Sequence, residues 1–228
     1  MIAQKSAYRS SLIAGLGVLI LTFSGALLEP VKVCGPLPAS YPPIIAFELA
    51  RSVTDLQAIF GAAGGECRDK IVARMDLTNR IDCFFFIPLY GAFVILYLLG
   101  ARSRNPRLGN LAVAIGAVAC VGDYFENLCL FHLSANPDVA SGWLTGLEWT
   151  TGVKWMGLGI AGAIGGYLAD IRIAALGFIV RLAGALGLLG ATAATISPAT
   201  FGPYLSLAIA LGWLAFLVID AREAFRRG

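Results

Sequence analysis

The chain has 228 residues, of which 58% are hydrophobic and 14% are charged, with a formal net charge of +3. Soluble domains carry about 25% charged residues, so this composition excludes an ordinary soluble globular protein. The small net charge also argues against a nucleic-acid-binding surface. Several apolar runs approach the roughly 20 residues that a helix needs to cross a bilayer. The sequence therefore predicts an all-α, polytopic membrane helix bundle.

We predict six transmembrane helices in a single transmembrane domain. They cover residues 11–28, 81–100, 108–132, 143–168, 172–196 and 201–220. The first run is also compatible with a cleaved signal peptide, because Ser24, Gly25 and Ala26 are small residues of the kind that a signal peptidase accepts. Its apolar run is long for a signal peptide, so we expect it to remain as a membrane helix.

Lysine and arginine residues cluster in alternate connections between the predicted spans. They precede the first span and follow the second, fourth and sixth: Lys5, Arg9, Arg102, Arg104, Arg107, Arg172, Arg222, Arg226 and Arg227. The opposite short links, Ser134–Gly142 and Ser197–Thr200, contain neither residue type. Because cytoplasmic loops are enriched in these residues, the pattern predicts cytoplasmic N- and C-termini and an even number of spans.

The segment 29–80 is expected outside the cytoplasm, as a periplasmic or extracellular helical loop between the first two spans. Within it, residues 42–60 predict one amphipathic helix, because apolar residues recur at helical spacing. Its other side carries Glu48, Arg51 and Asp55, whose spacing allows them to pair. Such a helix can lie on the membrane surface or cap the bundle by packing on its own protein.

The segment 66–80 predicts a further helix that runs into the second span. Cys34 and Cys67 flank the amphipathic helix in a compartment where disulfides form, and we hypothesise a disulfide that staples the external loop. Spacing alone does not fix the geometry, so two unpaired thiols are the alternative. A zinc site is not expected, because the chain has one histidine and no C-x-x-C pair.

Polar residues inside the predicted spans are the main functional signal. A charge at the centre of a membrane helix costs about 2.5–3.5 kcal/mol on insertion scales, so each one needs a partner or a wet cavity. The candidate ligand-binding residues are Asp82, Tyr90, Asp123, Glu126, Asn127, Glu148, Lys154 and Arg181. Asp123, Glu126 and Asn127 project from one side of their helix. The predicted topology gathers the carboxylates in the outer half of the bundle, beneath the segment 29–80.

Two other interpretations of these charges stay open. Lys154 and Arg181 can neutralise Asp123 and Glu126 as purely structural ties between helices. The acidic groups outnumber the basic ones, however, so some carboxylates stay unmatched unless they are protonated or bind a cation. A hard divalent cation is one candidate, and its ligands would be Asp82, Asp123, Glu126 and Asn127. The cofactor is unknown, and the sequence requires none.

Four short motifs carry a resemblance to a known group of proteins. They are F-E-L-A at Phe47–Ala50, R-I-D-C-F-F-F-I-P-L-Y at Arg80–Tyr90, D-Y-F-E-N at Asp123–Asn127, and Lys154. In this combination the chain resembles uncharacterised bacterial multi-pass membrane proteins, over residues 40–165. The resemblance implies a location in the bacterial inner membrane and brings no known activity.

Three functions remain open. The first is binding or transport of a small polar or cationic solute or a lipid headgroup, which would reach Asp82, Asp123 and Glu126 from the outer side with Lys154 as counter-ion. The second is a membrane enzyme that acts on a lipid by carboxylate acid–base or divalent-metal chemistry. The third is a non-catalytic assembly subunit that uses its glycine-lined helix faces. The expected partners are membrane lipids, a lipid or small-molecule ligand and a second copy of the chain, with no nucleic acid.

Overall fold

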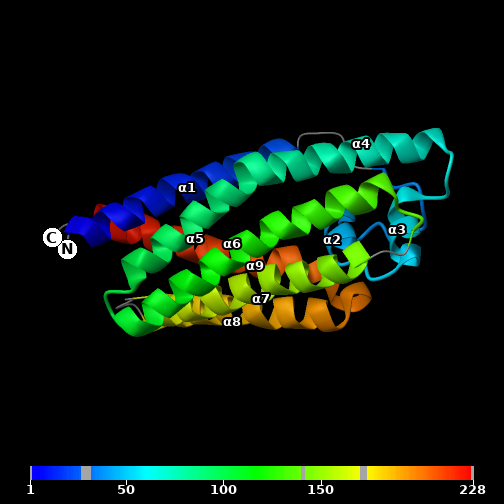
Figure 1. Ribbon diagram of the computed structural model, residues 1–228. Coiled ribbons are helices and arrows are strands. Elements are labelled where there is room, and N and C mark those ends of the chain that lie inside the picture. The colour runs from blue at the N-terminus through cyan, green and yellow to red at the C-terminus, as the bar shows by residue number, and fades with distance from the viewer. Residues whose placement is uncertain (1, 27–31, 140–141, 170–173, 227–228) are drawn as a thin grey trace.

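The computed structural model describes residues 2–26, 32–139, 142–169 and 174–226 (Figure 1). In these ranges the chain is helical and contains no strand, which confirms the predicted all-α class. The helices are α1 (Ile2–Ala26), α2 (Pro43–Glu48), α3 (Val53–Phe60), α4 (Glu66–Ile81), the π-helical segment η1 (Asp82–Phe86), α5 (Ile87–Ala101), α6 (Pro106–Ala135), α7 (Gly142–Leu168), α8 (Ala174–Ile196) and α9 (Pro198–Phe225). Residues 27–28 and 172–173 of the predicted spans lie outside the described residues, as do Arg172 and Arg227.

Several of the helices are long and apolar enough to cross a membrane. Among the described residues there are five: Gln4–Ser24, Glu66–Ala101, Pro106–Ala135, Leu176–Ile196 and Pro198–Phe225. The predicted fourth span corresponds to α7, which has 27 residues but is less apolar, since it contains Glu148 and Lys154 as well as several threonines and glycines. Large apolar side chains such as Ile13, Phe84 and Ile196 are exposed on the long helices. Such an apolar exterior suits a protein that is surrounded by lipid.

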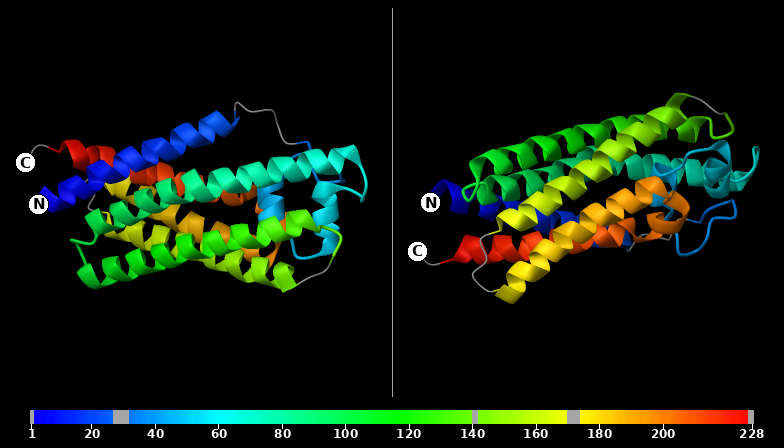
Figure 2. Two further views of the ribbon diagram at one scale, coloured as in Figure 1. Left: turned by 45° about the horizontal axis from the view of Figure 1, so that its top comes forward. Right: turned by 90° about the horizontal axis from the view of Figure 1, so that it is seen from below.

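The long helices pack side by side in a closed ring. Around the ring, α1 packs on α5, α5 on α6, α6 on α7, α7 on α8, α8 on α9, and α9 again on α1. The views in Figure 2 show the helices running roughly along one common direction. Glycine permits the close approach of α7 and α8, because a Cβ atom at Gly166 would lie 2.9 Å from the carbonyl oxygen of Val180. This agrees with the close packing expected for small residues in membrane helices.

Both termini lie at one end of the bundle (Figure 1), and the basic residues at the start of α1, at the end of α9 and in the link between α5 and α6 lie there with them. Lys5 donates a hydrogen bond to the carbonyl oxygen of Arg226 at 3.0 Å, which joins the start of α1 to the end of α9. At the same end, Gln4 donates to Ser103 in the link between α5 and α6 at 2.8 Å. Arg104 in that link donates to the carbonyl oxygen of Ala169 at 2.9 Å. The start of α1, the link between α5 and α6, the end of α7 and the end of α9 therefore share one end of the molecule.

The short helices α2 and α3 lie at the opposite end (Figure 1). They correct the prediction of one continuous helix over residues 42–60, because α2 ends at Glu48 and α3 begins at Val53. Ser52 has an extended backbone, and its side chain accepts a hydrogen bond from the backbone N–H of Asp55. The Asp55 carboxylate in turn accepts from the backbone N–H of Arg51 at 2.9 Å. This capping pattern starts a new helix and breaks the old one.

Covalent and polar links hold this end together. Cys34 and Cys67 form a disulfide with their Cα atoms 5.9 Å apart, as predicted. Asp138, in the link between α6 and α7, accepts hydrogen bonds from Arg68 at the start of α4 and, at 3.2 Å, from Gln57 in α3. We call residues 32–65 the cap. The disulfide joins the cap to the start of α4, and the Asp138 contacts join α3 and α4 to the link between α6 and α7.

A single continuous helix runs from Glu66 to Ala101, which confirms that the predicted helix 66–80 continues into the helix that contains residues 81–100. Its middle is the π-helical segment η1, where the N–H of Ile87 bonds to the carbonyl oxygen of Asp82, five residues back. Pro88 follows directly and has no N–H to donate, so the regular ladder of hydrogen bonds is interrupted here. Such wider turns occur often at functional sites, and this one begins with Asp82.

Candidate functional site: a buried acidic network

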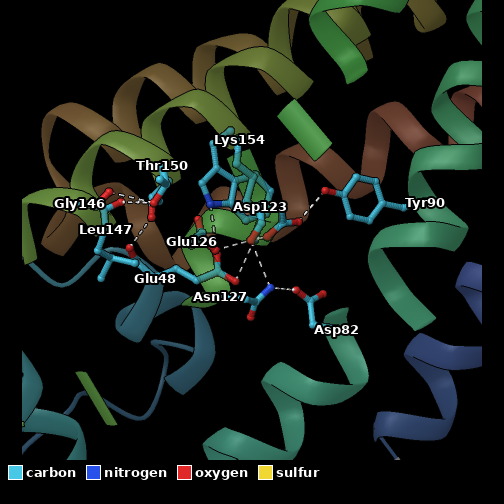
Figure 3. A network of polar contacts seen from close by, with 12 residues as sticks. Glu48, Asp82, Tyr90, Asp123, Glu126, Asn127, Gly146, Leu147, Thr150 and Lys154 are labelled. Atoms are coloured by element: carbon cyan, nitrogen blue, oxygen red, sulfur yellow. Dashed lines mark hydrogen bonds and ion pairs between the residues drawn. The ribbon is translucent and has the colours of Figure 1, made fainter. Parts of the chain in front are cut away.

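Three carboxylates converge on the ammonium group of Lys154 (Figure 3). The Lys154 Nζ atom lies 2.8 Å from Glu126 Oε1, 2.9 Å from Asp123 Oδ1 and 3.2 Å from Glu48 Oε1. All four residues are buried. An ammonium group has three N–H donors, so one lysine can serve all three carboxylates. The contact joins the neighbouring helices α6 and α7 to α2, which is distant from both in the sequence.

Helix α6 presents the centre of this network. Asp123, Glu126 and Asn127 are fully or almost fully buried, as their shared helix face predicts. The Tyr90 hydroxyl donates to Asp123 Oδ2 at 2.5 Å. Asn127 donates from its side-chain amide to Asp82 Oδ2 at 2.5 Å and to the carbonyl oxygen of Asp123 at 3.3 Å. Six of the eight predicted site residues therefore belong to one network.

Asp82 is the member of the network that is partly exposed, whereas the other carboxylates are buried. It lies at the start of η1, with the exposed apolar side chains of Phe84 and Phe85 close behind it in the sequence. A chain of contacts leads inward from Asp82 through Asn127 and Asp123 to Lys154. Asp82 is thus the point at which the network meets its surroundings.

Glu48 belongs to the network, although the sequence analysis did not include it among the candidate ligand-binding residues. Its carboxylate accepts a hydrogen bond from Trp155 Nε1 at 3.1 Å, and its carbonyl oxygen accepts one from the Thr151 hydroxyl at 2.9 Å. Burial raises the pKa of Glu48, and the nearby Lys154 opposes this rise. The sequence does contain a signal for this position, because Ser52 and Asp55 form a helix N-cap that starts a new helix at Val53. The prediction that Glu48 faces outward assumed one continuous helix through this point.

Two predicted residues are not brought into the network. Glu148 forms an ion pair with Arg51 at 3.5 Å, and 58% of its side chain is exposed. It precedes Lys154 by six residues, a spacing that puts two side chains on different faces of a helix. Arg181 is exposed on α8, so the structural tie between Arg181 and the buried acids is not formed.

The geometry gives no support to the divalent-metal hypothesis. Among the described residues, no group of three histidine, cysteine, aspartate or glutamate side chains has the arrangement of a metal site. Instead, the Lys154 ammonium occupies the position between Asp123, Glu126 and Glu48 that a cation would take. The resident positive charge of the network is therefore part of the chain.

Buried polar atoms near the network lack protein partners. Glu126 Oε2 is one of them, and both side-chain amide atoms of Asn79 are others. Asn79 is fully buried and lies one helical turn before Asp82 on the same continuous helix. An unsatisfied buried polar group costs about 1–3 kcal/mol, so these atoms indicate polar partners outside the chain.

The motif resemblance stays a prediction. Comparisons of the chain with models of protein families, with curated proteins and with solved structures find no match.

Proposed function

We propose that the chain spans the bacterial inner membrane six times, with α7 as the additional span and with both termini in the cytoplasm. The support for α7 is its place in the ring, between α6 and α8 and of comparable length. The support for the orientation is that the arginine-bearing links share the end with the termini. In this topology α1 is retained because it closes the ring between α5 and α9, and the cap lies on the periplasmic side.

We infer that the acidic network binds a small cationic solute from the periplasmic side and releases protons in exchange. The observation that carries this proposal is its charge: four carboxyl groups (Glu48, Asp82, Asp123 and Glu126) are in contact with one ammonium, that of Lys154, or with its hydrogen-bonded neighbours. Uncompensated charges in a poorly solvated interior are costly. The excess negative charge therefore has to be neutralised by protons or by a bound cation.

A site of this kind can exchange bound protons for a bound cation, since either one neutralises the excess carboxylates. A cation that enters at Asp82 gains a carboxylate and the oxygen atoms of its neighbours, and the protons that previously balanced the network are released. The unpartnered atoms Glu126 Oε2 and those of Asn79 offer further polar contacts. A purely structural network has no need of surplus carboxylates, because a one-to-one pair would tie two helices equally well.

The lipid-enzyme hypothesis has less support from the same geometry. General acid–base catalysis requires the catalytic group to reach the reacting atoms of the substrate. Of the four carboxylates, Asp82 alone is partly exposed, while the other three are enclosed between α2, α6 and α7. A solute small enough to enter the network fits this enclosure better than a lipid headgroup does.

Proton release in weakly buffered detergent solution tests the exchange. Purified protein receives Na⁺, K⁺, methylammonium or choline as the chloride salt, and a pH-indicator dye reports released protons. We expect release with at least one of these cations in the unmodified chain and its loss in Asp82→Asn and Asp123→Asn. Glu148→Gln is the matched control, since Glu148 lies outside the network. Absence of release with all four cations from the folded protein would overturn the proposal.

A further inference from the structure

A further buried carboxyl group, outside the acidic network, lies nearer the end of the bundle that contains the termini. Asp220 on α9 is fully buried, and its Oδ1 atom has no hydrogen-bond partner among the described residues. The Ser11 hydroxyl oxygen on α1 lies 2.6 Å from Asp220 Oδ2 and 2.9 Å from the carbonyl oxygen of Phe93. No role in the acidic network accounts for this group.

The hydrogen-bond geometry allows two arrangements, because the Ser11 hydroxyl lies within donating distance of both Asp220 Oδ2 and the carbonyl oxygen of Phe93. A serine hydroxyl has one proton to donate, and the carbonyl oxygen of Phe93 can only accept it. When Ser11 donates to Phe93, its short contact with Asp220 requires a proton on the Asp220 carboxyl group. The arrangement is then a chain of two hydrogen bonds, from Asp220 to Ser11 and from Ser11 to Phe93.

The charges around Asp220 favour the arrangement with a proton on its carboxyl group. Among the described residues, no lysine or arginine forms an ion pair with its carboxyl group. On α1, Arg9 directs its side chain to the carbonyl oxygen of Ala224. On α9, Arg222 and Glu223 pair with each other. The phenols of Tyr8 on α1 and Tyr97 on α5 also face this region.

An aromatic layer separates Asp220 from the acidic network. Its members come from α5 and α9: Tyr90, Phe93, Tyr97, Trp213 and Phe216. Tyr90 stacks on Trp213 with ring centroids 5.4 Å apart, and Tyr97 stacks on Phe216 at 3.7 Å. Phe93 contacts both Trp213 and Phe216. The layer thus runs without interruption between the two acid sites.

The layer touches a site at each end. The Tyr90 hydroxyl donates to Asp123 in the network, while the backbone of Phe93 lies against Ser11 beside Asp220. A small cavity beside Trp213 and Phe216 is lined by glycines, including Gly159, Gly162 and Gly184.

We propose that Asp220 and Ser11 form an inner proton site on the far side of the aromatic layer from the acidic network. The proton held by Asp220 leaves toward the end with the termini, and a proton released by a network carboxyl group replaces it. In this transfer an O–H bond breaks at the network carboxyl and forms at Asp220, so no oxidant or further reactant is involved. The relay rests on the proposed cation exchange, whereas the protonated state of Asp220 does not.

Infrared spectroscopy of the ligand-free protein tests the site at neutral pH. In the difference spectrum of the unmodified chain and Asp220→Asn, we expect loss of one carboxylic acid C=O band. Ser11→Ala should move that band to higher frequency by removing its hydrogen-bond partner. The matched control is Glu223→Gln on the same helical turn, which should lose carboxylate bands alone because Glu223 pairs with Arg226. Loss of carboxylate bands in Asp220→Asn would show an ionised Asp220 and overturn the proposal.

Proteoliposomes with a trapped pH dye test the relay, with the cation that releases protons in detergent as the driving gradient. We expect Asp220→Asn to slow net proton movement at least tenfold while it keeps the cation-induced release in detergent. Equal proton movement in the two proteins would overturn the relay. Failure of cation exchange itself appears as absent release from the unmodified chain, and the infrared result then still decides whether Asp220 is a proton site.

Discussion

The charged atoms of Lys154 and Glu48 lie 3.2 Å apart and join residues 32–65, the cap, to the bundle of long helices. Lys154 is on α7, whereas Glu48 ends the short helix α2. The segment between the first two predicted spans therefore supplies a side chain to the acidic network. Any movement of the cap that displaces α2 also changes the number of carboxylates around Lys154, so the cap and the site are mechanically coupled.

Removal of the Glu48 side chain should weaken the protein measurably. In Glu48→Ala, Trp155 loses its acceptor and Lys154 loses one of three carboxylates, while Asp123 and Glu126 remain in contact with the ammonium. We expect a loss of about 1–3 kcal/mol in the free energy of unfolding, the usual cost when buried polar groups lose a partner. Thermal unfolding in detergent measures it.

Glu148→Ala provides the matched comparison for this prediction. Glu148 is mostly exposed and pairs with Arg51 at 3.5 Å, and exposed ion pairs contribute about 0–1 kcal/mol. We therefore expect a small change in the melting temperature for this variant. Equal destabilisation by the two substitutions would contradict the assignment of Glu48 to the buried network.

Most of the network was predictable because membrane burial makes charges conspicuous. Asp82, Asp123 and Lys154 stand out in apolar runs, and the fixed period of a helix shows that Glu126 and Asn127 share the face of Asp123. The same period also separates Glu148 from Lys154. Periodicity does not determine how each helix is rotated about its axis within the bundle. The outward-facing position of Arg181 was therefore not predictable from the sequence.

Two members of the buried polar set were missed for different reasons. Glu48 lies in a short amphipathic segment, where an acidic residue on the polar side is unremarkable unless the break at Ser52 is recognised. Asp220 lies at the end of the predicted sixth span, where a charge is expected to reach the aqueous interface. Its burial depends on the packing of α1 against α9, a tertiary contact that the local sequence does not specify.

The link between α6 and α7 should loosen in acid. The hydrogen bonds from Arg68, and after them that from Gln57, lower the pKa of Asp138 from its ordinary value of 3.8 to about 2. A depressed folded-state pKa contributes stability that is fully present above the unfolded value and is lost as the pH falls through the folded one. We expect amide protection in residues 136–139 and 61–68 to decrease between pH 4 and pH 2.

Hydrogen exchange measured by mass spectrometry, corrected for the intrinsic pH dependence of exchange, checks this expectation. Asp138→Asn should show reduced protection already at neutral pH, with little further change in acid. Asp69→Asn is the control, because Asp69 is exposed on α4 close to Arg68. Protection that does not depend on pH in the unmodified chain would refute a role for the Asp138 carboxylate.

The disulfide should stabilise the cap specifically. Cys34 and Cys67 are 33 residues apart, and closing a loop of this size is worth about 3–4 kcal/mol in the chain-entropy model. We expect Cys34→Ser to increase the rate of proteolysis within the cap, while Cys83→Ser, which removes an unpaired thiol, leaves it unchanged. Intact-mass measurement after alkylation without reductant should show Cys34 and Cys67 protected, and alkylation of both would exclude the bond.

The hydroxyl of Tyr90 provides the sharpest test of the network, because it can be removed while the aromatic ring of the side chain stays in place. Tyr90→Phe should keep the stacking on Trp213 but remove the hydrogen bond to Asp123. A hydrogen bond to a charged group contributes about 1.5–3 kcal/mol, so we expect a loss in this range together with altered cation-induced proton release. Tyr97→Phe removes a bond to the carbonyl oxygen of Gly165 instead, and should reduce stability by about 0.5–1.5 kcal/mol without changing proton release. If the two variants released protons identically, Asp123 would not take part in the exchange, since removal of its direct donor would then have no effect on the site.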